Sequence, residues 1–164
     1  MENEMTIEAM VTRLGEELKA RGLTISTAES CTGGGIAAAF TEIAGSSEWF
    51  VGGFVTYSNE WKMKQLGVQA VTLQRHGAVS SQTVGEMLDG LLENGGADLG
   101  VAVSGIAGPG GGTPEKPVGT VYVGVAGKEW KRVERCHFDG GRGDVRRATI
   151  ETALCMMLEE VEKR

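Results

Sequence analysis

The stretch TAESCTGGG places two nucleophilic side chains, Ser30 and Cys31, directly before three consecutive glycines. A hydroxyl or thiol at such a turn could attack a bound carbonyl carbon, the first step of acyl transfer. If a helix begins after the turn, free backbone N–H groups there could stabilise an oxyanion or bind a phosphate, and the candidates are Thr32, Gly33 and Gly34. The same pattern is typical of a Ser/Thr cap with small residues for helix–sheet packing. Both interpretations stay open.

A serine nucleophile needs a general base, and the chain has only two histidines, His76 and His137. Neither is accompanied by an acid that would orient it, so we expect both to be structural or solvent-exposed. A lysine is the alternative, because TYSNEWK places Tyr57 at a strand end and Lys62 about one helical turn later. Burial or nearby positive potential must lower the pKa of such a lysine from ~10.4 toward ~7–8, and Tyr57 could share its proton. Lys62 could equally be an exposed helix lysine like Lys64.

Two arginines near the C-terminus are candidates for binding an anionic substrate group. GGRGDVRR places Arg142 in a glycine turn and Arg146 in the first turn of the final helix. Cations are unfavourable at a helix N-terminus unless they share a bound anion, so these arginines could bind a phosphate. Because acids outnumber bases in the chain, salt bridges to surface acids explain them equally well.

A second glycine-rich loop, SGIAGPGGGTPEKPVG, runs from Ser104 and Gly105 onward after a buried apolar run. Loops in this position bind ligands in α/β sheets, but the chain has no Gly-Lys-Ser/Thr and therefore no Walker A loop. The stretch 33–38 fits the looser dinucleotide pattern G-x-G-x-x-A. That fold also needs an acid at the end of the next strand, where Tyr57 and Asn59 stand instead. We therefore expect no dinucleotide-binding fold.

The remaining pattern predicts the elements that position these side chains. Apolar residues at helical spacing predict helices over 5–21 and 80–94. Start and stop signals predict three more: one after the three glycines, one capped by Ser58 or Asn59, and a last one that begins at GGRGD. Runs of β-branched and aromatic residues predict a hairpin near the C-terminus and strands at 23–28, 49–57 and 99–105. The order αβαβααβββα indicates a single α/β domain over residues 1–164 with a mixed sheet.

Charge and composition restrict the function classes. The formal net charge of −6 argues against a nucleic-acid-binding surface, which needs an excess of Lys and Arg on one face. The cysteines are odd in number and lack metal-binding spacing, so we expect reduced thiols and no metal site. No apolar stretch approaches ~18 residues, and the acidic N-terminus is unlike a signal peptide. We therefore expect a cytoplasmic protein without membrane contact.

Several motifs together resemble one known family. Over residues 5–160 the chain is similar to the C-terminal domain of the competence/damage-inducible protein CinA, through TAESCTGG, AGSSEWFVGGFVTYSNEWK, HGAVS, SGIAGPGGGTPEKPVGTV and GGRGDVRRATI. The resemblance implies a three-layer α/β/α fold and a homo-oligomer. It also implies hydrolysis of the carboxamide of nicotinamide mononucleotide to nicotinic acid mononucleotide and ammonia, without a metal or other cofactor. A catalytically silent nucleotide-binding regulatory module, linked to competence or damage response, is the alternative.

The resemblance further implies roles for individual residues. Ser30 matches the serine nucleophile of the family, Lys62 its general base and Tyr57 its assisting tyrosine. Backbone N–H groups after Ser30 are expected to hold the oxyanion, and Cys31 is the rival nucleophile. The residues expected to bind substrate are Gly45, Ser46, Ser47, Asn59, Ser104, Gly105, Arg142 and Arg146.

Overall fold

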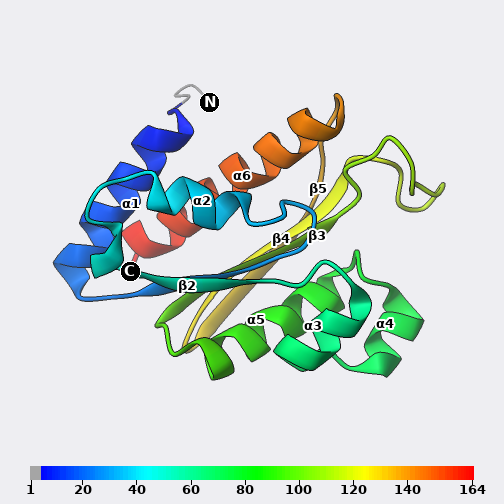
Figure 1. The fold of residues 1–164 in the computed structure, drawn as a ribbon, viewed down its shortest axis with the longest axis horizontal. Helices are drawn as coiled ribbons and strands as arrows, with labels where there is room; N and C mark the ends of the chain where they lie inside the picture. Colours follow the sequence, from blue (N-terminus) through cyan, green and yellow to red (C-terminus); the bar gives the residue numbers. More distant parts are fainter. Residues whose placement is uncertain (1–4) are drawn as a thin grey trace.

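A five-stranded mixed sheet forms the centre of the structure, a computed structural model that describes residues 5–164 (Figure 1). Its strands are β1 (Ile25–Glu29), β2 (Phe50–Val55), β3 (Leu99–Gly105), β4 (Thr120–Gly127) and β5 (Trp130–His137). The strand order is β2-β1-β3-β4-β5, and both β2 and β3 run parallel to β1. β4 runs antiparallel to β3 and to β5, which confirms the predicted hairpin.

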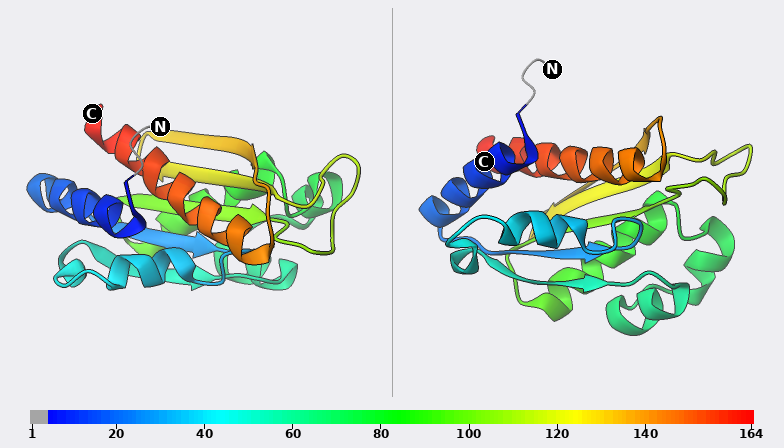
Figure 2. Two further views of the ribbon diagram at one scale, coloured as in Figure 1. Left: turned by 90° about the horizontal axis from the view of Figure 1, so that it is seen from above. Right: turned by 45° about the horizontal axis from the view of Figure 1, so that its top comes forward.

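Helices cover both faces of the sheet (Figures 1 and 2). They are α1 (Ile7–Arg21), α2 (Gly35–Thr41), α3 (Asn59–Leu66), α4 (Ala70–His76), α5 (Ser81–Gly95) and α6 (Arg142–Glu162). α1, α2 and α6 lie on one face, and α3, α4 and α5 on the other. The predicted three-layer α/β/α fold is thus confirmed, while residues 1–4 of the predicted domain lie outside the described part. None of the described helices combines the length and apolar character that crossing a membrane requires.

The two faces of the sheet differ in side-chain size because the central strands alternate valine with glycine or alanine. Val101 and Val103 of β3 pack into the core with α1 and α6, whereas Ala102 packs with α5. Gly124 of β4 also faces α5, where an added Cβ would lie 2.8 Å from Leu88 Cδ1. Small residues on this face therefore let α5 pack close to the sheet, and the period of two follows from strand geometry.

Helix α4 is missing from the order predicted from the sequence, and a tertiary contact explains why it forms. The carboxylate of Glu86 in α5 accepts hydrogen bonds from the Gln69 N–H (2.9 Å) and from Thr72 Oγ1 (2.6 Å). A neighbouring helix thus caps the start of α4, so no local side-chain cap marks its N-terminus. The other predicted elements are present, with ends shifted by at most two residues.

The carboxyl ends of the three parallel strands meet at one edge of the sheet, and candidate residues follow them. Ser30 comes after β1, Tyr57 after β2, and Ser104 lies near the end of β3. The Ser30 N–H donates to Val103 O (3.2 Å), which places the ends of β1 and β3 side by side. The start of α6 and the loop over residues 106–119 lie at the same edge (Figure 1).

Candidate active site

Ser30 and Lys62 are in direct contact although 32 residues separate them in the sequence. Lys62 lies in α3, whose start is capped by Ser58 Oγ, the acceptor of the Trp61 N–H (3.1 Å). Lys62 Nζ is 3.0 Å from Ser30 Oγ. The exposed fraction is 7% for Ser30 and 1% for Lys62. The structure therefore brings the predicted serine and lysine within hydrogen-bond distance in a place largely shielded from water.

Two backbone carbonyls complete the surroundings of the lysine amine. Lys62 Nζ lies 3.0 Å from Thr56 O and 3.0 Å from Tyr57 O. A neutral amine has two N–H groups and one lone pair, so donation to both carbonyls directs the lone pair at Ser30 Oγ. Once protonated, the same nitrogen can donate to all three oxygens. No ion pair within residues 5–164 includes Lys62, so no carboxylate stabilises its charge.

The pKa of Lys62 is lowered from its ordinary 10.5 to about 8. Burial is the main cause, because removing an ammonium from water disfavours its charged form, and it outweighs the opposing influence of the Cys31 thiol. A general base is most effective when its pKa lies close to the working pH. The buried lysine can therefore give up and accept a proton near neutral pH.

Glu29 holds the turn that carries Ser30. Its carboxylate is buried and accepts hydrogen bonds from Thr32 Oγ1 and from the N–H groups of Ile36 (2.8 Å) and Ala37 (2.9 Å). An anion is favourable at this place because the free N–H groups at the start of α2 carry partial positive charge. The start of α2 is thus already occupied by an anion of the protein, so the phosphate of a substrate has to bind elsewhere.

The predicted oxyanion donors are not equivalent in the structure. The Gly33 N–H donates to Ser30 O (3.0 Å), so it is not the free donor that the sequence pattern suggested. The N–H groups of Thr32 and Gly34 have no acceptor within residues 5–164. Gly33 and Gly34 have φ angles of 60° and 101°, which favour glycine and account for the glycine run. Thr32 and Gly34 are the donors that remain.

The thiol of Cys31, the rival nucleophile, lies in the apolar core. Cys31 is buried and packs in the same core cluster as residues of α1 and α6. The pKa of this thiol is raised from 9.0 to about 11, mainly by burial and also by the nearby Glu29 carboxylate. Because the thiolate is the reactive form, the geometry favours Ser30 over Cys31 as the nucleophile.

The Tyr57 hydroxyl is bonded to Arg142 and not to the Ser30–Lys62 pair. Tyr57 is 61% exposed, and its hydroxyl accepts a hydrogen bond from Arg142 Nη2 (3.1 Å). Arg142 Nη1 donates to Gly108 O (2.7 Å) in the loop over residues 106–119. Lys62 contacts Tyr57 through the backbone carbonyl. The proton-sharing role expected of the tyrosine is therefore not seen in this arrangement.

Arg146 is the second arginine at the start of α6, and it contacts the turn that follows β1. Its Nη2 donates to Thr32 O (2.9 Å), and its Nε is buried without a partner among the described residues. With Thr32, Gly35 and Gly143 it lines an open hollow of about 300 Å³. Leaving a buried N–H unpaired is unfavourable, so an anion that accepts from it would be stabilised.

Comparison with known proteins decides the family. A family model described as the CinA C-terminal domain matches residues 7–161. This chain belongs to that family. The nicotinamide-nucleotide amidohydrolase PncC of Enterobacter agglomerans is 49% identical over 98% of this chain and 99% of its own length. PncC of Escherichia coli strain K12 is 52% identical over 87% of each chain. The crystal structure of a CinA superfamily protein from Klebsiella pneumoniae 700603 has a TM-score of 0.94 and 37% identity, covering 98% of this chain and 100% of that chain.

Three residues that were expected to bind substrate lie at the other edge of this CinA domain. They come just before β2, where the parallel strands begin, and are Gly45, Ser46 and Ser47. Two residues further on, the backbone carbonyl of Trp49 accepts a hydrogen bond from the Ile25 N–H at the start of β1 (2.8 Å). The length of a strand therefore separates this segment from Ser30 within one chain, and the substrate-binding role expected of it stays a prediction (Figure 1).

The remaining predicted residues of the CinA domain lie at the edge that carries Ser30. Asn59 is the exposed first residue of α3. Ser104 is buried and pairs with Tyr122 of β4. A Cβ at Gly105 would lie 2.6 Å from Val121 Cγ2, so packing alone explains the glycine. These residues border the site, but no hydrogen bond links their side chains to Ser30 or Lys62 in the described part of the chain.

Two contributors to the site are absent from the sequence-based prediction. The carbonyl of Thr56 acts through a backbone atom, which no side-chain pattern reveals. The capping role of Glu29 could have been predicted from the sequence, because an acid just before a helix start commonly caps that helix.

His76 and His137 are both exposed, as predicted. In residues 5–164 no three His, Cys, Asp or Glu side chains gather closely enough to hold a metal ion.

Proposed function

We propose that this CinA domain hydrolyses the carboxamide of nicotinamide mononucleotide to nicotinic acid mononucleotide and ammonia, as a step of pyridine nucleotide salvage. The observation that carries the proposal is the buried contact of 3.0 Å between Lys62 Nζ and Ser30 Oγ. The names of the relatives that are 49% and 52% identical support the choice of substrate.

In the proposed reaction, neutral Lys62 accepts the proton of the Ser30 hydroxyl while Oγ attacks the amide carbon. The carbonyl oxygen becomes an oxyanion, which accepts hydrogen bonds from the N–H groups of Thr32 and Gly34. The C–N bond then breaks, and Lys62 gives its proton to the nitrogen, which leaves as ammonia. Water loses a proton to Lys62 and attacks the acyl carbon; the ester bond breaks, and the proton returns to Ser30.

We assign the phosphate of the substrate to the two arginines at the start of α6. The start of α2 is excluded because Glu29 already occupies it. Arg142 and Arg146 both approach the Ser30 edge, and guanidinium groups match the geometry of phosphate oxygens. In a chain with a net charge of −6, this local pair of cations also attracts an anionic substrate to the site.

The resemblance also leads us to infer a homo-oligomer. Large apolar side chains are exposed on the edge strand β2 and on α3, namely Val51, Val55, Trp61 and Met63. Exposed edge strands with such side chains often pair with another copy of the chain. Light scattering during size-exclusion chromatography tests this inference, and a concentration-independent monomer would contradict it.

The proposed activity is tested by incubating the purified protein with nicotinamide mononucleotide and measuring ammonia and nicotinic acid mononucleotide. Ser30→Ala should abolish product formation, whereas Cys31→Ala, its neighbour in the sequence, should retain most of the activity. An inactive Cys31→Ala alongside a fully active Ser30→Ala would contradict the serine mechanism. If the compound binds to wild-type protein without reaction, the chain is instead a catalytically silent nucleotide-binding module.

A further inference from the structure

Arg142 connects three segments that meet at the mouth of the site. Its Nη2 donates to the Tyr57 hydroxyl (3.1 Å), its Nη1 donates to Gly108 O (2.7 Å), and its backbone begins α6. The segment after β2, the loop over residues 106–119 and the last helix are thereby linked, although they are far apart in the sequence (Figures 1 and 2). We call these two hydrogen bonds the Arg142 clasp.

The backbone carbonyl and the side-chain hydroxyl of Tyr57 have different partners. The carbonyl of Tyr57 contacts Lys62 Nζ (3.0 Å), whereas its hydroxyl is engaged by Arg142. The side chain belongs to neither apolar core cluster and is largely exposed. Rotation about its side-chain torsions can therefore move the hydroxyl while the carbonyl stays on Lys62. Within the described residues, the bond to Arg142 is the one hydrogen bond of this hydroxyl.

A phosphate competes directly with both partners of the clasp. Gly108 O and the Tyr57 hydroxyl are neutral acceptors, and they use one guanidinium nitrogen each. Guanidinium groups form shorter and stronger hydrogen bonds with phosphate oxygens, often through two nitrogens at once. A phosphate that binds Arg142 through both Nη atoms takes the place of these two acceptors and releases Tyr57 and the loop together.

We propose that Arg142 makes the phosphate of the substrate a condition for fast turnover. In the free protein Arg142 retains the Tyr57 hydroxyl, and the substrate phosphate takes over the guanidinium donors. The released hydroxyl then turns to the Ser30–Lys62 pair and relays the proton between them and the leaving nitrogen. A carboxamide without an anionic group leaves the clasp closed and reacts slowly. This inference rests on the proposed function and adds a mechanism of specificity to it.

The test compares kcat/KM for nicotinamide mononucleotide with kcat/KM for nicotinamide riboside, which lacks the phosphate. Both are measured in wild-type protein, in Arg142→Gln and in Arg135→Gln. Arg135 is a matched control, because on β5 it donates to Glu115 O of the same loop (2.7 Å) and to the Tyr122 hydroxyl (3.2 Å). Thermal unfolding curves establish that each variant is folded.

Arg142→Gln should lower kcat/KM for the mononucleotide by about 10- to 100-fold, because a charged partner of the phosphate is lost. The same variant should raise kcat/KM for the riboside by roughly three- to tenfold, since Tyr57 is no longer held back. Arg135→Gln should change both values by less than about twofold. An unchanged or lower riboside value in Arg142→Gln overturns the inference, because Arg142 then binds phosphate or supports the fold without restraining Tyr57.

A second background separates the tyrosine from the loop. When Tyr57 is first changed to Phe, the Arg142→Gln substitution should no longer raise riboside hydrolysis. A rise that persists would assign the effect to the loop and overturn the role of Tyr57. If wild-type protein hydrolyses neither compound, the proposed function fails. If it hydrolyses the mononucleotide and Arg142→Gln behaves like wild type, this inference alone fails.

Discussion

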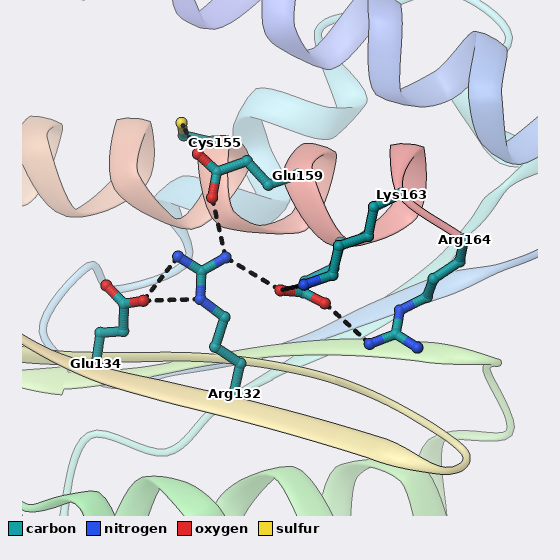
Figure 3. Close-up of polar contacts among 7 residues, drawn as sticks. Arg132, Glu134, Cys155, Glu159, Lys163 and Arg164 are labelled. Atoms are coloured by element: carbon teal, nitrogen blue, oxygen red, sulfur yellow. Dashed lines mark hydrogen bonds and ion pairs between the residues drawn. The ribbon is translucent and has the colours of Figure 1, made fainter.

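Two buried charged groups of the molecule, Lys62 and Glu160, have very different surroundings. The Glu160 side chain is 5% exposed and lies between three cations: Arg132 (3.2 Å), Lys163 (3.1 Å) and Arg164 (2.9 Å). Figure 3 labels these three cations. Lys62 is equally shielded, but it contacts two neutral carbonyls and a hydroxyl.

The different surroundings give the two charges different uses. Burial alone disfavours the Glu160 carboxylate, yet hydrogen bonds from Arg164 and Lys163 outweigh it and keep its pKa below the ordinary value of 4.5. Nothing comparable supports the Lys62 ammonium, so burial lowers its pKa to about 8. A compensated charge keeps its proton state and joins α6 to β5, whereas an uncompensated one can exchange a proton and serve catalysis.

The largest expected effect comes from removing the uncompensated charge. Lys62→Met should lower kcat/KM for nicotinamide mononucleotide by about 10³-fold, because the general base is lost. Lys64→Met, an exposed lysine of the same helix, should leave the activity within about twofold. Steady-state assays of both variants check this, and a Lys62→Met protein with more than about a tenth of the wild-type activity would exclude Lys62 as the base.

The pH dependence of the reaction should report the same group. Only neutral Lys62 accepts the serine proton, so kcat/KM should rise about tenfold per pH unit below the pKa of the free enzyme. The curve should level off above pH 8, since the pKa of Lys62 is lowered to about 8. A profile that is flat between pH 6 and about 9 would assign the base elsewhere.

Stability should rise with pH at both charges but in different pH ranges, and Lys62 responds at alkaline pH. Between about 8 and 10.5 the unfolded chain binds a proton that the folded chain has lost. Stability therefore rises with pH in this window, by at most about 1.4 kcal/mol per pH unit. The measurement is the free energy of unfolding in urea of wild type minus that of Lys62→Met, and a difference that falls with rising pH would contradict the assignment.

The smallest expected effect comes from removing the compensated charge of Glu160. Glu160→Gln should lower the free energy of unfolding by about 1–2 kcal/mol at pH 7 without affecting catalysis. Because the pKa of Glu160 is lowered, its contribution is present above pH 4.5 and disappears as the pH falls through its folded-state pKa. Glu159→Gln, at a 56% exposed side chain of the same network, should lose less than about 0.5 kcal/mol. Equal losses of unfolding free energy in both variants would refute the claim that the buried Glu160 contributes more than the exposed Glu159.

Most of the fold could be predicted because its signals are local. The alternation of valine with small residues in β3 and β4 and the capping of α1 by Thr6 follow from nearby residues alone. Helix α4 could not be predicted, since its N-terminal cap, Glu86, belongs to another helix. The prediction failed where a distant side chain completes a local element.

In the candidate site, too, the residue types could be predicted from the sequence, whereas the contacts between distant residues could not. The types of Ser30 and Lys62 suggested a nucleophile and a base, but their contact depends on how β1 and α3 pack. The position of Gly45 could not be judged from its spacing, because the direction of β2 decides which edge of the sheet it occupies. The contact between Tyr57 and Arg142 joins the second strand to the last helix, and no local pattern contains it.

The acceptors that align Lys62 are main-chain atoms, the carbonyl oxygens of residues 56 and 57. Every amino acid supplies such an oxygen, so these two contacts with Lys62 do not depend on which side chains stand at the two positions. An insertion or a proline between residue 57 and α3 changes the path of the chain instead, and evolution has little freedom to make that change.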